Sequence, residues 1–138
     1  MTEPAEASKE RPISAAVIVH EGRVLLVRRR VKEGSLSWQF PAGEVEEGEA
    51  ANAAAVRETR EETGLEVKDV LVLGERVHPN TGRTMIYVAC QVVGGNASVV
   101  DDDELVEFAW SDAKQITEYV PYPFYGPVQD YLNDHLLS

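Results

Sequence analysis

Residues 43 to 65 of this chain, GEVEEGEAANAAAVRETREETGL, join a glutamate-rich loop to a segment with strong helix propensity. Five alanines lie between residues 50 and 55, and alanine has the highest helix propensity of any residue. Gly64 stands where glycine commonly ends a helix in a left-handed conformation. The pattern therefore predicts a helix over residues 49 to 63, with a glycine-containing loop before it.

Three carboxylates of this expected helix share one side of it. At about 100° per residue, Glu61 lies roughly 60° from Glu58 in one direction and Glu62 about 40° in the other. Glu58 and Glu62 repel each other, and the C-terminal end of a helix disfavours negative charge. A cluster that violates local preferences suggests a bound cation, and carboxylates suit the hard ion Mg²⁺. A solvated charged face is the alternative that helical spacing leaves open.

Expected strands flank the helix on both sides. Residues 13 to 20 and 23 to 30 are largely apolar and are separated by a Glu-Gly pair, which predicts a hairpin. Two further apolar runs, residues 67 to 77 and 84 to 93, surround a loop with Pro, Asn and Gly. They predict a second pair of strands joined by a hairpin loop.

The last third of the chain predicts shorter elements. Short strands are expected over residues 97 to 100 and 105 to 110, and Ser111 is expected to cap a short helix over residues 112 to 116. A final amphipathic helix is expected over residues 123 to 136. One helix among several hairpins indicates an α/β fold of the α+β kind, with a mixed sheet between helices.

Length and charge limit the classes of protein and partner. A chain of 138 residues fits one domain, so we expect a polar N-terminal tail over residues 1 to 12 and a single domain over residues 13 to 138. Lys and Arg total 13 against 24 Asp and Glu, a net charge of −11, which disfavours nucleic acid polymers as partners. A small anionic substrate would then need divalent cations to approach.

Apolar runs and cysteine usage indicate the compartment. No apolar run approaches the roughly 20 residues that span a bilayer, and the first twelve residues lack the apolar stretch of a secretory signal. The sequence therefore predicts a cytoplasmic protein without a membrane partner. Cys90 is the single cysteine and lies in an apolar run, so we expect it to be a small buried hydrophobe.

Taken whole, residues 43 to 65 resemble the signature of the Nudix hydrolases. That signature is Gly, five residues, Glu, seven residues, Arg-Glu, an aliphatic residue, any residue, Glu-Glu, any residue, Gly and an apolar residue. The match fails only at Thr59, where the family usually has an aliphatic side chain. The preceding WQFPAG, residues 38 to 43, is similar to the family's Trp-x-x-Pro-Gly-Gly, with Ala42 in place of the first glycine. The resemblance implies a Nudix-type α/β/α sandwich.

The resemblance also implies a metal site and catalytic groups. The cofactor would be Mg²⁺, with Mn²⁺ as an alternative, and the candidate ligands are Glu58, Glu62, Glu61, the carbonyl of Ala42, and Glu104 in the late acidic loop. The general base would be Glu104 or Glu61, followed by Glu58, and Arg57 would orient the glutamates. Glu49 would brace the loop or hold an outer metal ion.

The implied substrate is a small-molecule nucleoside diphosphate derivative, which is cut at its pyrophosphate linkage by water. Candidate phosphate-binding residues are Arg28, Arg29 and Arg83, together with Arg30, although exposed basic turns need no ligand. Four aromatic residues could stack a base or simply pack in the core: Tyr119, Tyr122, Phe124 and Tyr125. Trp38 is expected to be structural.

Several activities fit this resemblance. The preferred one is pyrophosphohydrolysis of a (d)NTP or of oxidised dGTP, and the alternative is an ADP-ribose or nucleotide-sugar pyrophosphatase. A different class is a non-catalytic Nudix-fold sensor that binds a nucleotide without cutting it. The presence of every carboxylate of the signature disfavours the sensor. A homodimer is common in the family and is compatible with this sequence.

Overall fold

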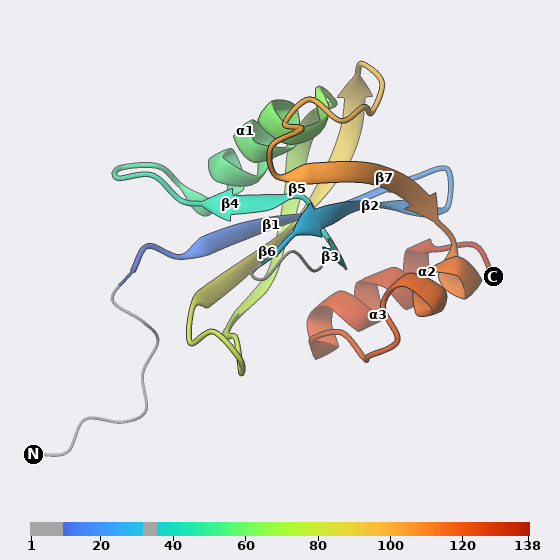
Figure 1. Ribbon diagram of the computed structural model, residues 1–138. Coiled ribbons are helices and arrows are strands. Elements are labelled where there is room, and N and C mark those ends of the chain that lie inside the picture. The colour runs from blue at the N-terminus through green and yellow to red at the C-terminus, as the bar shows by residue number, and fades with distance from the viewer. Residues whose placement is uncertain (1–9, 32–35) are drawn as a thin grey trace, which may run out of the picture.

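The computed structural model describes residues 10–31 and 36–138. Most of the expected N-terminal tail, residues 1–9, lies outside the described residues. Seven strands and three helices are formed within the described part of the chain (Figure 1). They are β1 (Ile13–His20), β2 (Arg23–Arg30), β3 (Leu36–Gln39), β4 (Ala42–Glu44), α1 (Ala51–Thr63), β5 (Glu66–Val77), β6 (Thr84–Gly94), β7 (Leu105–Ser111), α2 (Ala113–Tyr119) and α3 (Gly126–His135).

The strands form a mixed sheet with β1 near its centre. The order is β3-β2-β1-β6-β5, and β4 pairs with β1 while β7 pairs with β2. β1 and β6 run parallel, whereas the other described pairs are antiparallel. The predicted mixed sheet is confirmed. None of the described helices has the length and apolar composition needed to cross a membrane.

Alternation along β1 divides the core between the two faces of the sheet. Ala15 and Val17 pack in a cluster with Ile116 of α2 and with residues of α3. Ala16 and Ile18 point the other way and pack in a cluster with α1. Because successive side chains of a strand point to opposite faces, a strand buried on both faces is apolar throughout. Figure 1 shows α1 on one side of the sheet and α2 and α3 on the other, which confirms the α/β/α sandwich.

Cys90 lies in the α1-side core and is almost fully buried. Burial raises the pKa of its thiol to about 12. The prediction of a structural, buried cysteine is confirmed.

Helix α1 begins at Ala51, two residues later than predicted, and ends as predicted at Gly64, whose φ is 74°. Thr59, at the usually aliphatic position, is fully buried. Its hydroxyl donates to the carbonyl of Ala55 at 2.8 Å, within the same helix. The polar atom is therefore satisfied without a partner outside the helix, so the departure from the family pattern does not leave an unpaired group in the core.

The strand predicted over residues 97 to 100 is wrong. The backbone N–H of Ser98 donates to the carbonyl of Thr63 at 2.9 Å, and that of Val100 donates to the carbonyl of Glu62 at 2.9 Å. The last carbonyls of a helix have no partner within it, so this segment satisfies the end of α1 instead of joining the sheet. Conversely, β4 is a strand where the sequence predicted loop, because it pairs with β1.

The predicted cap at Ser111 is also wrong. Asp112 caps α2, because its carboxylate accepts from the backbone N–H of Lys114 at 3.1 Å and of Gln115 at 2.9 Å, while Gln115 accepts from the Asp112 N–H. Ser111 ends β7, and its buried hydroxyl has no hydrogen-bond partner among the described residues. The last helix begins at Gly126, three residues later than predicted.

Alanine substitutions at Asp112 and at its neighbour Ser111 should affect the free energy of unfolding differently. Asp112→Ala removes a capping box and should lower the free energy of unfolding by about 1 kcal/mol. Ser111→Ala removes a buried hydroxyl without a partner and should leave stability unchanged or slightly raised. Urea unfolding followed by circular dichroism measures both. A loss for Ser111→Ala equal to that for Asp112→Ala would contradict this assignment of the cap.

Candidate active site

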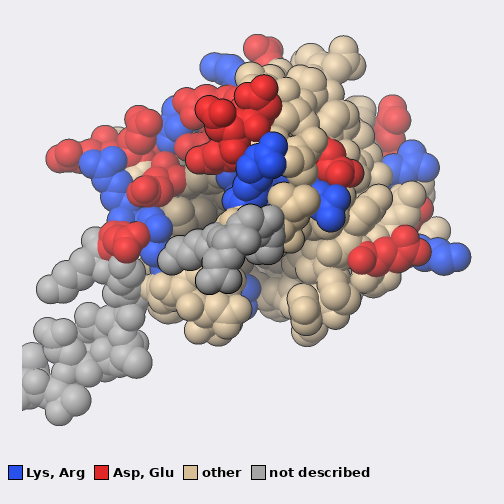
Figure 2. Space-filling model, viewed as in Figure 1, with Lys and Arg blue, Asp and Glu red and all other residues tan. Residues whose placement is uncertain are grey.

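Carboxylates of α1 line one wall of a cleft with a volume of about 1660 Å³. Glu58, Glu61 and Glu62 reach this wall together with the β4 residues. Residues of β1, β2, β3, β5 and β6, with the α2–α3 region, line other parts of the cleft. Figure 2 shows acidic side chains gathered over α1 and the loop before β7, with basic side chains directly beside them. The same cleft is thus lined by the acids of α1 and by basic residues of other elements.

Glu62 is the most deeply placed of these carboxylates, with 3% of its side chain exposed. Both of its oxygens accept from Nη2 of Arg29, at 2.9 and 2.8 Å, and Oε1 also accepts from the N–H of Ala42 at 3.3 Å. Burial raises its pKa to about 7, against the opposing effect of the Arg29 charge. Glu62 is therefore a buried acid that depends on a neighbouring cation.

Glu58 lies directly against Gly43 of β4. A Cβ atom on Gly43 would overlap the Glu58 carboxylate, so the absence of a side chain there makes room for this acid. Burial raises the pKa of Glu58, and Arg57 donates to it at 2.8 Å. The consecutive residues Ala42 and Gly43 thus contact Glu62 and Glu58 respectively, which brings two predicted metal ligands to one short strand.

The alanine at position 42 keeps the backbone carbonyl in an ordinary conformation. Among the described residues, Glu21 is the only non-glycine with a positive φ. The replacement of the family's glycine by Ala42 therefore causes no backbone strain, and its carbonyl remains available as a ligand.

Arg57 contacts the glutamates that it was predicted to orient. It donates to Glu58 at 2.8 Å, to Glu61 at 3.2 Å, and to both oxygens of Glu49 at 2.8 and 2.9 Å. The hydrogen bond from Arg57 lowers the pKa of Glu49 to about 2. Glu49 also accepts from the N–H of Glu46 at 3.0 Å, which supports the first of its two expected roles, bracing the loop between β4 and α1.

Glu61 and Glu104 are the exposed acids of the cleft, with 57% and 60% of their side chains accessible. Glu61 extends from α1, and Glu104 extends from the loop before β7 and accepts from Nη1 of Arg29 at 2.9 Å. Both carboxylates can therefore reach water.

The predicted phosphate-binding arginines separate into different environments. Arg29 lies among the carboxylates, whereas its neighbour Arg28 pairs with Glu107 at 3.2 Å. Arg83 lines the cleft and is held by Glu10 at 2.8 Å and by the carbonyl of Arg11 at 2.6 Å. Of these three, Arg29 and Arg83 face the cleft.

Two further basic residues line the cleft and were not among the predicted site residues: Arg76 of β5 and His78 of the loop that follows it. The guanidinium of Arg76 lies over the rings of Tyr87 and Tyr125, at 6.0 and 5.5 Å from their centroids. Burial lowers the pKa of His78. Only Arg76 lies within the strand expected over residues 67 to 77, so the sequence carried no local signal that joins it to His78.

The aromatic residues of the cleft also differ in role. Phe124 and Tyr125 pack against Phe40 and Tyr87, with centroids 5.4 and 5.5 Å apart, which supports the core alternative for both. Trp38 and Tyr119 lie 4.4 Å apart at the cleft surface. Tyr122, by contrast, is 74% exposed. Trp38 is partly buried and packs against the core, which agrees with the structural role expected of it, whereas Tyr119 and Tyr122 are exposed along the cleft.

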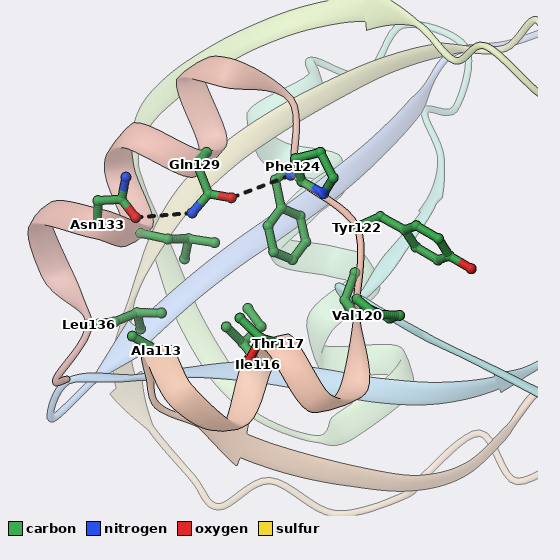
Figure 3. A pocket seen from close by; sticks show the side chains of 12 residues that line it. Ala113, Ile116, Thr117, Val120, Tyr122, Phe124, Gln129, Asn133 and Leu136 are labelled. Carbon is green, nitrogen blue, oxygen red and sulfur yellow. Dashed lines mark hydrogen bonds between the residues drawn. The ribbon is translucent and has the colours of Figure 1, made fainter.

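A second cavity, of about 460 Å³, lies between α2 and α3 (Figure 3). Its polar groups include Gln129, which donates to Asn133 at 3.0 Å and accepts from the N–H of Phe124 at 3.4 Å. None of the residues that line this cavity is charged. A diphosphate requires cationic partners, so the larger cleft is the better candidate for the active site.

Whether the cleft suits a divalent cation depends on its donor atoms. Within residues 10–31 and 36–138, no three side chains of His, Cys, Asp or Glu converge on one point. The acids are instead held by two guanidinium groups, those of Arg29 and Arg57. However, the Arg29 guanidinium shows that a cation fits between Glu62 and the Ala42 carbonyl, and oxygen donors of this kind suit a hard divalent ion.

A model of the NUDIX domain matches residues 10–130 of the chain. The chain belongs to the Nudix hydrolase family. Members of this family hydrolyse pyrophosphate linkages and generally use divalent cations. The family resemblance predicted from residues 43 to 65 is therefore confirmed.

Named relatives of this Nudix chain have different substrates. It is 33% identical over 121 residues to "RNA pyrophosphohydrolase" of Caulobacter vibrioides, which covers 74% of this chain and 70% of the relative. It is 32% identical over 116 residues to "Putative 8-oxo-dGTP diphosphatase 2" of Mycobacterium tuberculosis, which covers 79% of this chain and 80% of the relative. Family membership therefore leaves the substrate open.

A solved Nudix hydrolase from Nitrosomonas europaea has the same fold. The two structures superpose with a TM-score of 0.75 and 25% identity, covering 93% of this chain and 92% of the other. Two further relatives, one from Arabidopsis thaliana and one from Caenorhabditis elegans, are much longer proteins. This chain spans 46% and 37% of their respective lengths.

Gly43 provides a test of this Nudix site. Gly43→Ala should push the Glu58 carboxylate away from β4 and weaken Mn²⁺ binding about tenfold or more, the loss typical of a displaced supporting group. Gly126→Ala is the matched control, because a Cβ there meets nothing within 4 Å. Titration monitored by electron paramagnetic resonance gives both affinities. Unchanged Mn²⁺ affinity in Gly43→Ala would show that Glu58 is not a ligand.

Proposed function

We propose that this chain uses Mg²⁺ to hydrolyse the pyrophosphate linkage of a nucleoside diphosphate derivative. The observation that carries this proposal is the contact of Ala42 with the buried carboxylate of Glu62, and of Gly43 with the partly buried carboxylate of Glu58, at the wall of a large cleft. In this proposal the ion is held by Glu58, Glu62 and the Ala42 carbonyl, with Glu61 and Glu104 as further ligands.

A divalent cation bound there would neutralise the charge of the diphosphate. It would also stabilise the negative charge that develops on the bridging oxygen of the leaving group. The protein's own groups perform the positioning. Arg57 fixes Glu58 and Glu61 through hydrogen bonds of 2.8 and 3.2 Å, so neither carboxylate has to be reoriented when a substrate enters. This arrangement makes Arg57 a positioning residue.

The proton of the attacking water passes to a carboxylate in this proposal. Glu104 and Glu61 are the first candidates, since both are exposed in the cleft and can contact water. Glu58 follows, because it is more buried and lies directly against Arg57 and Gly43. A base must come within hydrogen-bond distance of the water, and exposure allows this for the first two.

The preferred substrate is a (d)NTP, with oxidised dGTP as the leading member. The exposed rings of Tyr119 and Tyr122 in the same cleft support recognition of a base. Cationic Arg76 and Arg83 give further phosphates a partner in the cleft. The similarity to the Mycobacterium relative supports the same choice, and the net charge of −11 opposes binding along an RNA backbone.

Glu62 gives the catalytic prediction. Glu62→Gln should lower kcat at least about a hundredfold, or roughly 2.7 kcal/mol, because it removes a negative charge from the metal site. The variant should still fold, since the amide is the same size as the acid. Glu107→Gln is the control, because Glu107 pairs with Arg28 outside the cleft and should keep wild-type turnover. Near-wild-type turnover in Glu62→Gln would refute the assignment.

A substrate screen tests the proposed function itself. The panel contains dNTPs, 8-oxo-dGTP, ADP-ribose, nucleotide sugars, dinucleoside polyphosphates and an RNA oligonucleotide with a 5′-triphosphate, each with and without Mg²⁺. Release of pyrophosphate from a dNTP or from 8-oxo-dGTP is the expected result. AMP and ribose phosphate from ADP-ribose would favour the alternative, and tight nucleotide binding without Mg²⁺-dependent turnover would favour the sensor.

A further inference from the structure

The guanidinium of Arg29 lies where the oxygens proposed as metal ligands meet. Its Nη2 donates to both oxygens of Glu62, at 2.9 and 2.8 Å, and to the carbonyl of Ala42 at 3.3 Å, while its Nη1 donates to Glu104 at 2.9 Å. Only 15% of the Arg29 side chain is exposed. Three of the proposed ligand groups thus share one cation that belongs to the chain itself.

The strand geometry explains why Arg29, and not its neighbour, takes this position. Successive residues of a strand point to opposite faces, so Arg28 and Arg29 separate, and the β2–β7 register shifts between them. Arg28 pairs with Glu107 and lies 5.9 Å from the ring centroid of Trp38. Arg29 turns inward to Glu62, and the two arginines form a natural pair for comparison.

A buried carboxylate is costly unless a positive charge lies beside it. In the structure, Arg29 supplies that charge to Glu62. A Mg²⁺ ion held by the same oxygen atoms would bring two positive charges next to the guanidinium, and like charges this close repel each other. Binding of the ion therefore favours the departure of Arg29 from these oxygens.

We propose that Arg29 is an exchangeable counterion of the metal site. In the metal-free protein it neutralises Glu62 and occupies the Ala42 carbonyl; when a divalent cation binds, its guanidinium gives up both and turns to the cleft, where it can pair with phosphate. Arg29 would then become available to an anionic substrate only after the metal has bound, which orders the two binding events. This inference rests on the proposed metal site.

The first test compares the Mn²⁺ affinities of two arginine variants with that of the wild type. Arg29→Gln removes the competing guanidinium and should tighten Mn²⁺ binding at least about tenfold, equivalent to about 1.4 kcal/mol. Arg28→Gln removes the same charge from the adjacent residue and should change the affinity by less than about threefold, because that arginine is partly exposed and screened. Equal or weaker Mn²⁺ binding by Arg29→Gln would overturn the proposal.

Thermal unfolding separates exchange from a purely structural role. In EDTA, Arg29→Gln should unfold at a lower temperature than the wild type, because Glu62 loses its counterion. In saturating Mn²⁺ most of this difference should disappear, since the ion replaces the missing charge. A purely structural arginine would lower the unfolding temperature equally in both conditions, and that result would also overturn the proposal.

A measurement on the wild type remains decisive even if Arg29→Gln fails to fold. The NMR signal of the Arg29 side-chain Nε–H should shift on titration with Mg²⁺ while that of Arg28 stays nearly constant. An unmoved Arg29 signal in protein that binds Mg²⁺ contradicts the exchange but leaves the proposed function intact. Absence of Mg²⁺ and Mn²⁺ binding altogether contradicts both.

Discussion

The need of a buried carboxylate for a positive charge is the constraint on which this site depends. Glu62 is nearly inaccessible, and its position follows from the packing of α1 against the sheet. Arg29 reaches it from β2, and Ala42 reaches it from β4, so three elements distant in sequence meet at one acid. Arg57 performs the corresponding task for the remaining glutamates of α1. Two arginines, Arg29 and Arg57, thus pair with the acids that are proposed to bind a cation.

Much of this arrangement could be predicted from local sequence. The helix that bears Glu58 and Glu62 follows from its alanines and from Gly64, and the first hairpin follows from β-branched runs around a Glu-Gly turn. The pairing of Arg57 with Glu61 follows from their separation of four residues. These features depend on neighbours in the chain, which the sequence displays directly.

Features that depend on partners distant in sequence could not be predicted in the same way. Residues 97 to 100 look like a strand, but their N–H groups satisfy the end of α1. Glu49 stands at the start of the helix expected over residues 49 to 63, yet it lies outside α1 and contacts Arg57. Basic Arg28 and Arg29 look equivalent in sequence, and only the fold shows that one faces a buried acid while the other pairs at the surface. Tertiary contacts decide each of these cases.

The position of the metal ion is the most direct test of this account. A crystal of the protein soaked in Mn²⁺ and measured near the manganese absorption edge would locate the ion by its anomalous scattering. We expect a peak within about 2.3 Å of oxygens of Glu58 and Glu62 and of the Ala42 carbonyl, with the Arg29 guanidinium turned into the cleft. A peak elsewhere in the cleft, with Arg29 still bound to Glu62, would contradict it.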